Sequence, residues 1–238
     1  MTHAIRVLGV CGSPRKRGNS WFLLERALEA SAGAVPVPVE TTFYSLAGKT
    51  FACCDSCFKC REIGGCRHED DFQELRDLWL AADAILYSVP MYHMNLPGQL
   101  RCFLDRLGNS LPGPDQKFLK PVGAIAQGAH LFSGQEAAIM ALVQHALIMG
   151  CVPVSGDMWQ SYIGAGGWTH GHGERGALQK LTDSGDPTAQ AVVAAAASVG
   201  KRVVQLALLI RAGAEAYHAF LAQDVAYQAL VSALPPAD

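Results

Sequence analysis

The feature that most constrains the fold lies at the start of the chain, where an apolar run is followed at once by a small polar loop and a helical pattern. The run Ile5–Cys11 has the length and continuous hydrophobicity of a parallel strand covered on both faces. The loop 12–20 (GSPRKRGNS) separates it from an amphipathic stretch that ends near Ala32. This order predicts the first unit of an α/β fold with a parallel sheet.

The rest of the chain repeats the alternation of strand and helix patterns. Further strands are expected over residues 37–44, 84–89, 122–126 and 152–155. Further helices are expected over residues 70–82, 97–107, 136–149, 189–212 and 214–234. The segment 162–186, with seven glycines, has no clear periodicity and is expected to be an irregular excursion over the surface or the site. The pattern predicts one doubly wound domain.

Composition excludes several classes of protein. Half of the 238 residues are hydrophobic, the net charge is only −2, and no arginine-rich stripe is present, which argues against a nucleic-acid surface. The most apolar late stretch, 192–210, is interrupted by Lys201, Arg202 and Gln205, whereas a membrane span needs about 20 mostly apolar residues. The chain starts without a signal-peptide layout. We therefore expect a cytoplasmic protein that binds neither nucleic acid nor membrane.

The loop 12–20 has the chemistry of an anion site. Its backbone amides and the N-terminus of the following helix would face a bound anion. Side chains and a close-approach glycine suited to phosphate are Ser13, Arg15, Gly18, Asn19 and Ser20. The loop is neither a P-loop nor a G-x-G-x-x-G dinucleotide loop. The alternative is an ordinary strand-to-helix turn that binds nothing.

Five of the eight cysteines lie within positions 53–66. Cys11, Cys102 and Cys151 stand singly in apolar surroundings and are interpreted as small buried hydrophobic residues. The steps C-x2-C-x2-C-x5-C, formed by Cys54, Cys57, Cys60 and Cys66, are typical of ferredoxin-type cluster loops. Structural zinc sites usually join two separated ligand pairs, so this spacing favours a four-iron cubane. Zinc, a reversible disulfide switch and vestigial thiols remain as alternatives.

Together these motifs resemble those of the NADPH-dependent FMN reductase and flavodoxin-like superfamily. The phosphate loop is followed by a strand that ends in Ser-Val-Pro-Met-Tyr and by a helix with Phe-Leu-Asp-Arg, over residues 82–92 and 100–106. The resemblance implies a five-stranded flavodoxin-like sheet in the order 2-1-3-4-5 with a helical C-terminal extension. It also implies that the FMN phosphate lies on the first loop and that two further loops border the flavin ring, through Pro90, Met91, Tyr92, His93, Met94, Asn95, Gln127, Gly128 and Gly134.

The cysteine motif resembles that of archaeal and bacterial iron–sulfur flavoproteins, which pair a compact C-x2-C-x2-C-x4–7-C motif with FMN. This resemblance implies that Cys54, Cys57, Cys60 and Cys66 hold a [4Fe–4S] cluster and that Cys53 is an extra cysteine. It also implies a homodimer or homotetramer. Residues 1–160 would form the FMN-binding core with the cysteine-rich loop 53–66, and residues 161–238 would add the glycine-rich loop and the C-terminal helices.

The expected function is that of an FMN-dependent oxidoreductase or electron-transfer flavoprotein whose cluster and flavin pass electrons to a small acceptor, such as a quinone or an oxygen species. NAD(P)H and a ferredoxin-like protein are the candidate donors. Three alternatives stay open: an NAD(P)H-dependent FMN or quinone reductase without a cluster, a non-enzymatic electron carrier, and an FMN-dependent biosynthetic dehydrogenase. No general acid or base stands out, as expected where a cofactor carries the chemistry.

Overall fold

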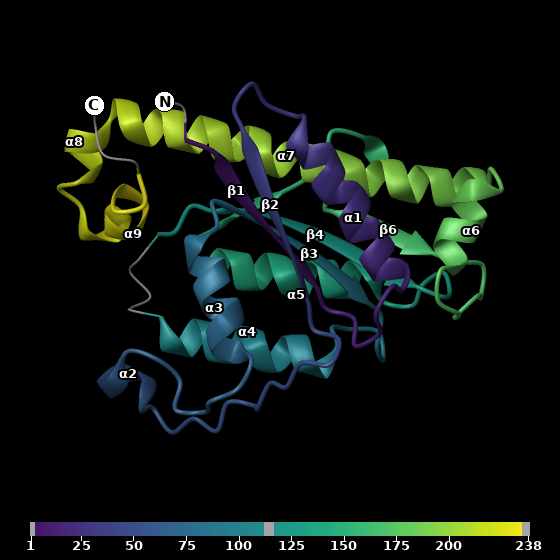
Figure 1. Cartoon of the computed structure of the whole chain (residues 1–238), viewed down its shortest axis with the longest axis horizontal. Coiled ribbons are helices and arrows are strands. Elements are labelled where there is room, and N and C mark those ends of the chain that lie inside the picture. Colours follow the sequence, from purple (N-terminus) through teal and green to yellow (C-terminus); the bar gives the residue numbers. More distant parts are fainter. Residues whose placement is uncertain (1–2, 112–116, 235–238) are drawn as a thin grey trace.

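Parallel strands form the centre of the structure, a computed structural model that describes residues 3–111 and 117–234 (Figure 1). Five of them have the neighbour order β2-β1-β3-β4-β5, with every pairing parallel. They are β1 (Ile5–Cys11), β2 (Val39–Ser45), β3 (Ala84–Pro90), β4 (Pro121–Gly128) and β5 (Val152–Val154). The predicted flavodoxin-like order is therefore confirmed, and it places the ends of β1, β3 and β4 side by side.

A sixth strand corrects the expectation that 162–186 is wholly irregular. β6 (Ala165–Trp168) pairs in parallel with the second half of β4, whereas β5 pairs with the first half. Between β5 and β6 the chain passes through a short 3-10 turn, η1 (Trp159–Ser161). The strand was missed because two of its four residues are glycines. A side chain at Gly167 would overlap Val192, so the glycine admits the helix packed over this strand.

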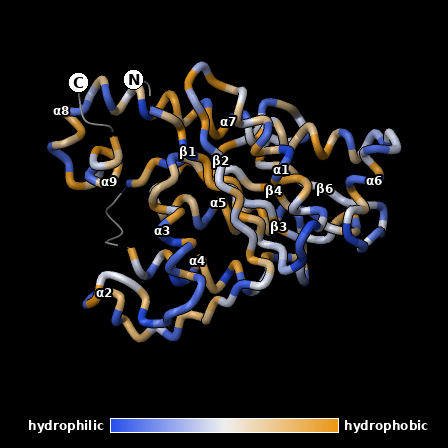
Figure 2. Tube along the Cα trace, in the orientation of Figure 1, coloured by the Kyte–Doolittle hydropathy of each residue, from blue (hydrophilic) through white to orange (hydrophobic). Residues whose placement is uncertain are grey.

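Helices cover both faces of the sheet, as a doubly wound fold requires (Figure 1). One face carries α1 (Asn19–Ala32) and α7 (Pro187–Ala216), and the other carries α3 (Phe72–Ala81), α4 (Gly98–Ser110) and α5 (Gln135–Ile148). Each face has its own cluster of buried apolar side chains. In Figure 2 the most hydrophobic segments accordingly follow the strands and the inner sides of the helices. β1 and β3 are nearly continuously apolar because both of their faces are covered.

The C-terminal third differs from its prediction in detail. A short helix, α6 (Ala177–Asp183), precedes α7, and α7 is a single 30-residue helix whose first turn is capped by Asp186. By length and composition α7 could cross a membrane, but it packs along α1 and the sheet, where a side chain at Gly200 would overlap the Ala27 carbonyl. The helix expected over 214–234 is wrong. Three short elements replace it, namely α8 (His218–Leu221), η2 (Val225–Tyr227) and α9 (Gln228–Val231).

Candidate functional site

The three loops predicted to hold a flavin lie next to one another at the carboxyl edge of the sheet. The Gly12 amide donates to the Ser88 carbonyl at 2.9 Å, and the Met91 amide donates to the Gln127 carbonyl at 3.0 Å. These bonds join the end of β1 to β3 and the end of β3 to β4. The sequence therefore brings the predicted loops together at the point where ligands bind in open α/β sheets.

The first loop leaves the N-terminus of α1 open to an anion. Gly18 is the N-cap residue, no side chain caps the helix, and no acidic residue occupies its first turn. The unpaired amides and the helix dipole make this end electropositive. Ser13 and Ser20 are buried, and the Ser13 hydroxyl accepts a hydrogen bond from the Arg15 amide at 3.2 Å. The loop is ordered by its own hydrogen bond and leaves the helix end uncapped, which is the arrangement that the predicted phosphate site requires.

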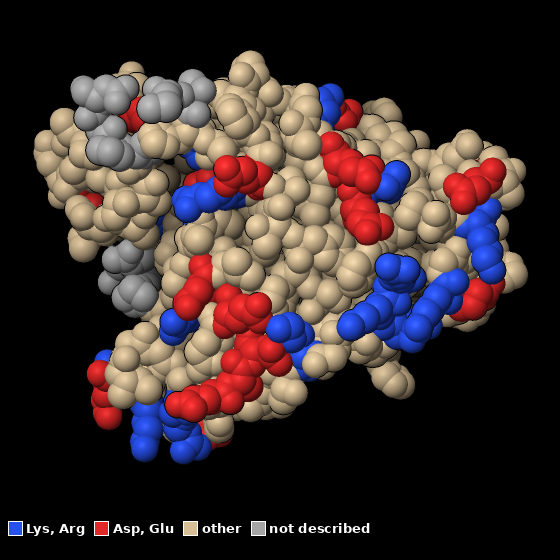
Figure 3. All heavy atoms as spheres, viewed as in Figure 1, with Lys and Arg blue, Asp and Glu red and all other residues tan. Residues whose placement is uncertain are grey.

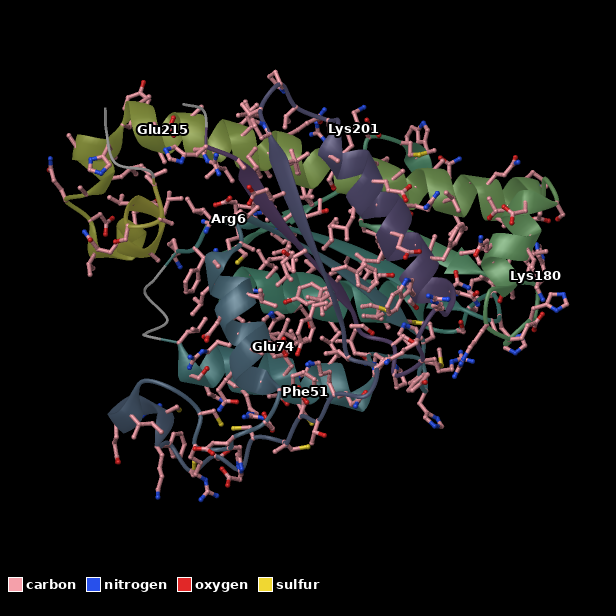
Figure 4. All side chains as sticks on the ribbon, viewed as in Figure 1. Arg6, Phe51, Glu74, Lys180, Lys201 and Glu215 are labelled. Atoms are coloured by element: carbon pink, nitrogen blue, oxygen red, sulfur yellow. The ribbon has the colours of Figure 1, made fainter. Side chains whose placement is uncertain are left out.

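A distant segment packs against this loop, which the sequence did not predict. The Arg15 guanidinium donates to the Gly173 carbonyl at 3.0 Å, and the Asn19 side-chain oxygen accepts from the Leu178 amide at 3.1 Å. Lys and Arg side chains gather at this end of the molecule, where Figure 4 labels Lys180 beside α6 (Figures 3 and 4). Among the ion pairs of residues 3–111 and 117–234, none engages the cations of these two segments, which are Arg15, Lys16, Arg17, Arg175 and Lys180.

The second loop is a tight turn that presents apolar side chains to solvent. Tyr92 and Asn95 form an isolated antiparallel bridge, and the two residues between them, His93 and Met94, have φ of 47° and 62°. Two consecutive left-handed residues are the pattern of a type I′ turn, here without the usual glycine. Such strained backbone is typical of functional loops. Pro90 and Met91 lead into the turn, where Tyr92 and Met94 are exposed and could lie against a flat ring.

The third loop packs directly on the second. Gly134 has φ of +100°, and a Cβ there would overlap the backbone of Met94. Gly128 is enclosed by its own loop, because a Cβ would overlap the Ser133 hydroxyl. Gln127 differs from expectation in one respect. Its side chain is buried on the α7 side of the sheet beside Gly167, and only its carbonyl oxygen reaches the second loop. The flavin-binding roles of these three loops stay predictions.

The four cysteines of the predicted cluster motif line one small cavity of about 60 Å³ between the cysteine loop and α4. The loop contains a single helical turn, α2 (Cys60–Ile63), and Figure 4 shows its yellow sulfur atoms between α2 and the labelled Phe51. Cys54, Cys57, Cys60 and Cys66 all face this cavity, whereas Cys53 does not. Within the described ranges, no three His, Cys, Asp or Glu side chains are close enough together to hold a metal ion.

Two polar residues of α4 contact the cysteine sulfurs. The Arg106 Nε donates to the Cys66 Sγ at 3.2 Å, and the Asn109 side-chain amide donates to the Cys54 Sγ at 3.6 Å. The Cys60 thiol in turn donates to the Asn109 carbonyl at 3.0 Å. Sequence reasoning missed both contacts. The available signal was an arginine within the apolar stripe of the helix predicted over 97–107.

Arg106 also joins the two ends of the cysteine loop. Its side chain is 1% exposed and donates to the Ala52 carbonyl at 3.2 Å, the His68 carbonyl at 2.9 Å and the Asp70 carboxylate at 2.6 Å. Its guanidinium also lies 4.2 Å from the Phe72 ring centroid. Burial by itself would raise the pKa of Asp70, but Arg106 and two backbone amides outweigh it and hold that pKa below the usual range. Asp70 therefore stays ionised against a buried cation.

The surface of the cysteine loop carries exposed ionic contacts, in contrast to the buried Arg106–Asp70 pair. Arg67 pairs with Asp55 at the surface and holds the pKa of that carboxyl well below its usual range. His68 also lies 3.4 Å from Asp55. These exposed contacts position the loop but contribute little stability, because water screens them.

Comparisons with known proteins identify the family of the chain. The sequence model of the NADPH-dependent FMN reductase family matches residues 5–163. An iron–sulfur flavoprotein of Methanocaldococcus jannaschii is 32% identical over 207 residues, which cover 87% of this chain and all of that one. An iron–sulfur flavoprotein of Archaeoglobus fulgidus is 32% identical over 167 residues, which cover 68% of this chain and 82% of that one.

Solved structures show the same fold at low sequence identity. The crystal structure of RosB, which contains a bound riboflavin-5'-phosphate derivative, has a TM-score of 0.64 at 16% identity and covers 94% of this chain and 90% of that one. An azoreductase from Bacillus anthracis has a TM-score of 0.57 at 15% identity and covers 83% and 99%. The resemblance drawn from the motifs is confirmed: the chain belongs to the NADPH-dependent FMN reductase family and is an FMN-dependent oxidoreductase related to the iron–sulfur flavoproteins.

Proposed function

We propose that the protein passes electrons from a reduced donor, through a [4Fe–4S] cluster and FMN, to a small acceptor such as a quinone. The observation that carries the proposal is that four cysteines line one cavity, with hydrogen-bond donors from α4 directed at their sulfurs. Relatives that match most of the chain are named iron–sulfur flavoproteins. The sulfur site and the flavin loops are formed by different residues, so each centre would have its own ligands.

The chemistry of the residues present fits both groups, and the four thiols would have to converge around a cluster, because no three of them in the described chain are close enough together to hold a single metal ion. For FMN, the uncapped N-terminus of α1 and Arg15 would hold the phosphate, and the Tyr92–Asn95 turn with the Gly134 loop would border the ring. For the cluster, four thiolates are the soft ligands that iron–sulfur centres use, and donors to sulfur tune their reduction potential. When bound, FMN supplies one- and two-electron chemistry. The chain's own contribution is to orient the groups and set the polarity around them.

Anaerobic purification followed by an absorption spectrum and metal analysis tests the cluster. The expected result is a brown protein with iron and sulfide near four per chain, the cubane stoichiometry. Cys57→Ser should remove the iron and leave FMN bound, whereas Cys151→Ser, which changes a buried cysteine elsewhere, should retain both. Zinc in place of iron, or empty thiols, would refute the cluster. Loss of FMN from Cys57→Ser would refute the separation of the two sites.

A second candidate is an NAD(P)H-dependent FMN or quinone reductase that works without a cluster. The basic side chains beside the first loop favour it, since unpaired cations would suit a phosphate-bearing donor. Rapid bleaching of bound flavin by NADPH in Cys57→Ser would support this function. Turnover of a small quinone by the purified chain would argue against a carrier that depends on a partner protein.

The assembly is proposed as a cytoplasmic homodimer or homotetramer supplied by NAD(P)H or a ferredoxin-like donor. Exposed apolar side chains on α5 support a subunit contact, because Leu147 and Ile148 are 60% and 75% exposed. Light scattering of the holoprotein gives the mass directly. A monomer at micromolar concentration would contradict the proposed assembly.

A further inference from the structure

Two cysteines outside the four-cysteine cavity face each other. The Cys53 Sγ at the start of the cysteine loop lies 2.7 Å from the Cys102 Sγ on α4. Neither residue lines the cavity formed by the other loop cysteines. Sequence reasoning treated Cys102 as a buried hydrophobic residue, but it is only half-buried and its thiol has a sulfur partner.

The other described thiols have different surroundings. The Cys54 sulfur accepts from Asn109, Cys60 donates to the Asn109 carbonyl, and Cys66 accepts from Arg106. Cys11 and Cys151 are buried elsewhere in the fold. None of these five thiols has another sulfur as its hydrogen-bond partner, so the contact between Cys53 and Cys102 does not follow simply from the density of cysteines in the loop.

We propose that Cys53 and Cys102 are a redox-active thiol pair that closes to a disulfide and ties the start of the cysteine loop to α4. Cys53 is exposed, so a low-molecular-weight disulfide such as oxidised glutathione can reach its sulfur. The Cys53 thiolate attacks one glutathione sulfur and releases one glutathione thiolate. The Cys102 sulfur then attacks the Cys53 sulfur and releases the second. Two protein thiols lose two electrons and two protons, and oxidised glutathione becomes two molecules of glutathione.

The surrounding structure is already arranged for this bond. A disulfide needs about 2.05 Å between its sulfurs, so the pair must approach by a fraction of an ångström. The neighbouring Ala52 carbonyl is held to α4 by Arg106, which keeps the two backbones in place. Closure would fix the residue that precedes Cys54, the first candidate cluster ligand. It would thereby hold the loop near α4 whether or not the cavity is filled, so the inference does not rest on the proposed cluster.

Peptide mapping tests the pair. Holoprotein is equilibrated anaerobically in buffers of defined reduced-to-oxidised glutathione ratio, alkylated with iodoacetamide and digested with trypsin. Residues 50–59 hold Cys53, Cys54 and Cys57, and residues 102–106 hold Cys102, so the bond joins two separate peptides. The linked species is expected from the unmodified chain and from Cys54→Ser, to be absent from Cys53→Ser and Cys102→Ser, and to disappear with dithiothreitol.

Three outcomes would overturn the proposal. They are a linked species that survives in Cys53→Ser, a Cys102 fully alkylated at every glutathione ratio, and loss of iron from Cys53→Ser. The last would make Cys53 a metal ligand, whereas the proposal expects that variant to keep the metal content of the unmodified chain. Peptide mapping detects the Cys53–Cys102 disulfide whether or not the four-cysteine cavity holds a cluster. The disulfide proposal and the cluster proposal can therefore fail separately.

Discussion

Replacing Arg106 by methionine tests the network that organises the sulfur site. The side chain is 1% exposed and pairs with Asp70, which is 9% exposed. Methionine retains most of the apolar stem but removes the guanidinium that lies over Phe72, and with it the charge and all of the hydrogen bonds. The variant therefore leaves the buried Asp70 carboxylate without its cation and the Ala52 carbonyl without its donor, and it removes one of the two donors to the His68 carbonyl.

The expected loss of stability follows from the buried charge. Removing one partner of a buried ion pair typically costs about 3–5 kcal/mol, because the remaining charge is uncompensated. The free energy of unfolding of a domain is about 5–15 kcal/mol in total, so the variant would lose a large fraction of it. Arg101 on the same helix offers a matched control. It pairs with Asp105 at 3.3 Å, but both side chains are about half exposed, so Arg101→Met should cost less than about 1 kcal/mol.

Urea unfolding followed by circular dichroism, at pH 7 and at lower pH, measures the effect. Because the Asp70 pKa is depressed in the folded chain, its contribution is present above the ordinary pKa of about 4 and is lost as the pH falls through the folded value. The difference between the unmodified chain and Arg106→Met should therefore shrink on acidification. Adding Asp70→Asn should recover part of the loss at pH 7.

If Arg106→Met lowers the free energy of unfolding by less than about 1 kcal/mol at pH 7, the range expected for the exposed control Arg101→Met, Arg106 and Asp70 are not a buried pair of the expected strength. The double variant Arg106→Met/Asp70→Asn gives a second check. If its loss of unfolding free energy equals the sum of the losses of the two single variants, the two residues act independently and do not form the expected pair. Iron analysis of the same samples adds a second measurement. Arg106→Met should bind less iron, since the loop ends and the Cys66 sulfur lose their common donor.

Three further predictions concern other parts of the chain. Arg15→Ala should weaken FMN binding about 10- to 100-fold and leave riboflavin binding unchanged in fluorescence titrations; an equal loss for both ligands would exclude a phosphate contact. Gly134→Ala should lower the free energy of unfolding by about 2–3 kcal/mol and weaken FMN binding, because its Cβ would overlap Met94. Gly185→Ala, where the space is open and φ is +84°, should lower the free energy of unfolding by about 1 kcal/mol. Equal losses would refute the close approach of Gly134 to Met94. Burial lowers the pKa of Lys120 to about 8, so above that pH the unfolded chain binds more protons than the folded chain. The free energy of unfolding, measured relative to that of Lys120→Met, should therefore rise by about 2 kcal/mol between pH 7.5 and 9.5. A difference that does not change with pH would contradict the burial of Lys120.

The strand order could be predicted because each core strand carries its own local signal. β1 and β3 are apolar runs of strand length, and the loops after them contain the polar and glycine residues that end a strand. β6 had no such signal, since one of its glycines, Gly167, is required by packing against Val192 of α7 and Gln127 rather than by the strand itself. The break after α7 was also missed, because the alanine-rich sequence 214–234 has good helix propensity but few buried contacts.

The candidate site shows the same division between local and tertiary information. The anion loop and the cysteine spacing are contiguous in sequence, so they could be identified directly. The contacts that complete them join residues far apart in the chain. Arg106 lies 40 positions from Cys66, Asn109 lies 55 from Cys54, and Gly173 lies 158 from Arg15. A spacing rule cannot reach such pairs, because the fold decides which helix faces which loop.

Helix α4 connects the two parts of the site physically. Its N-cap, Pro97, follows the Tyr92–Asn95 turn within two residues, and its other end lies against the cysteine loop. Cys102, Arg106 and Asn109 are spaced by four and three positions, so one stripe of the helix carries all three sulfur contacts. A helix is stiff along its axis, so a shift of that stripe would also move the turn predicted to border the flavin. The sulfur site and the predicted flavin turn therefore share one rigid support, so Arg106→Met in this stripe should alter FMN binding as well as iron binding, whereas Cys57→Ser in the cysteine loop should alter iron binding alone.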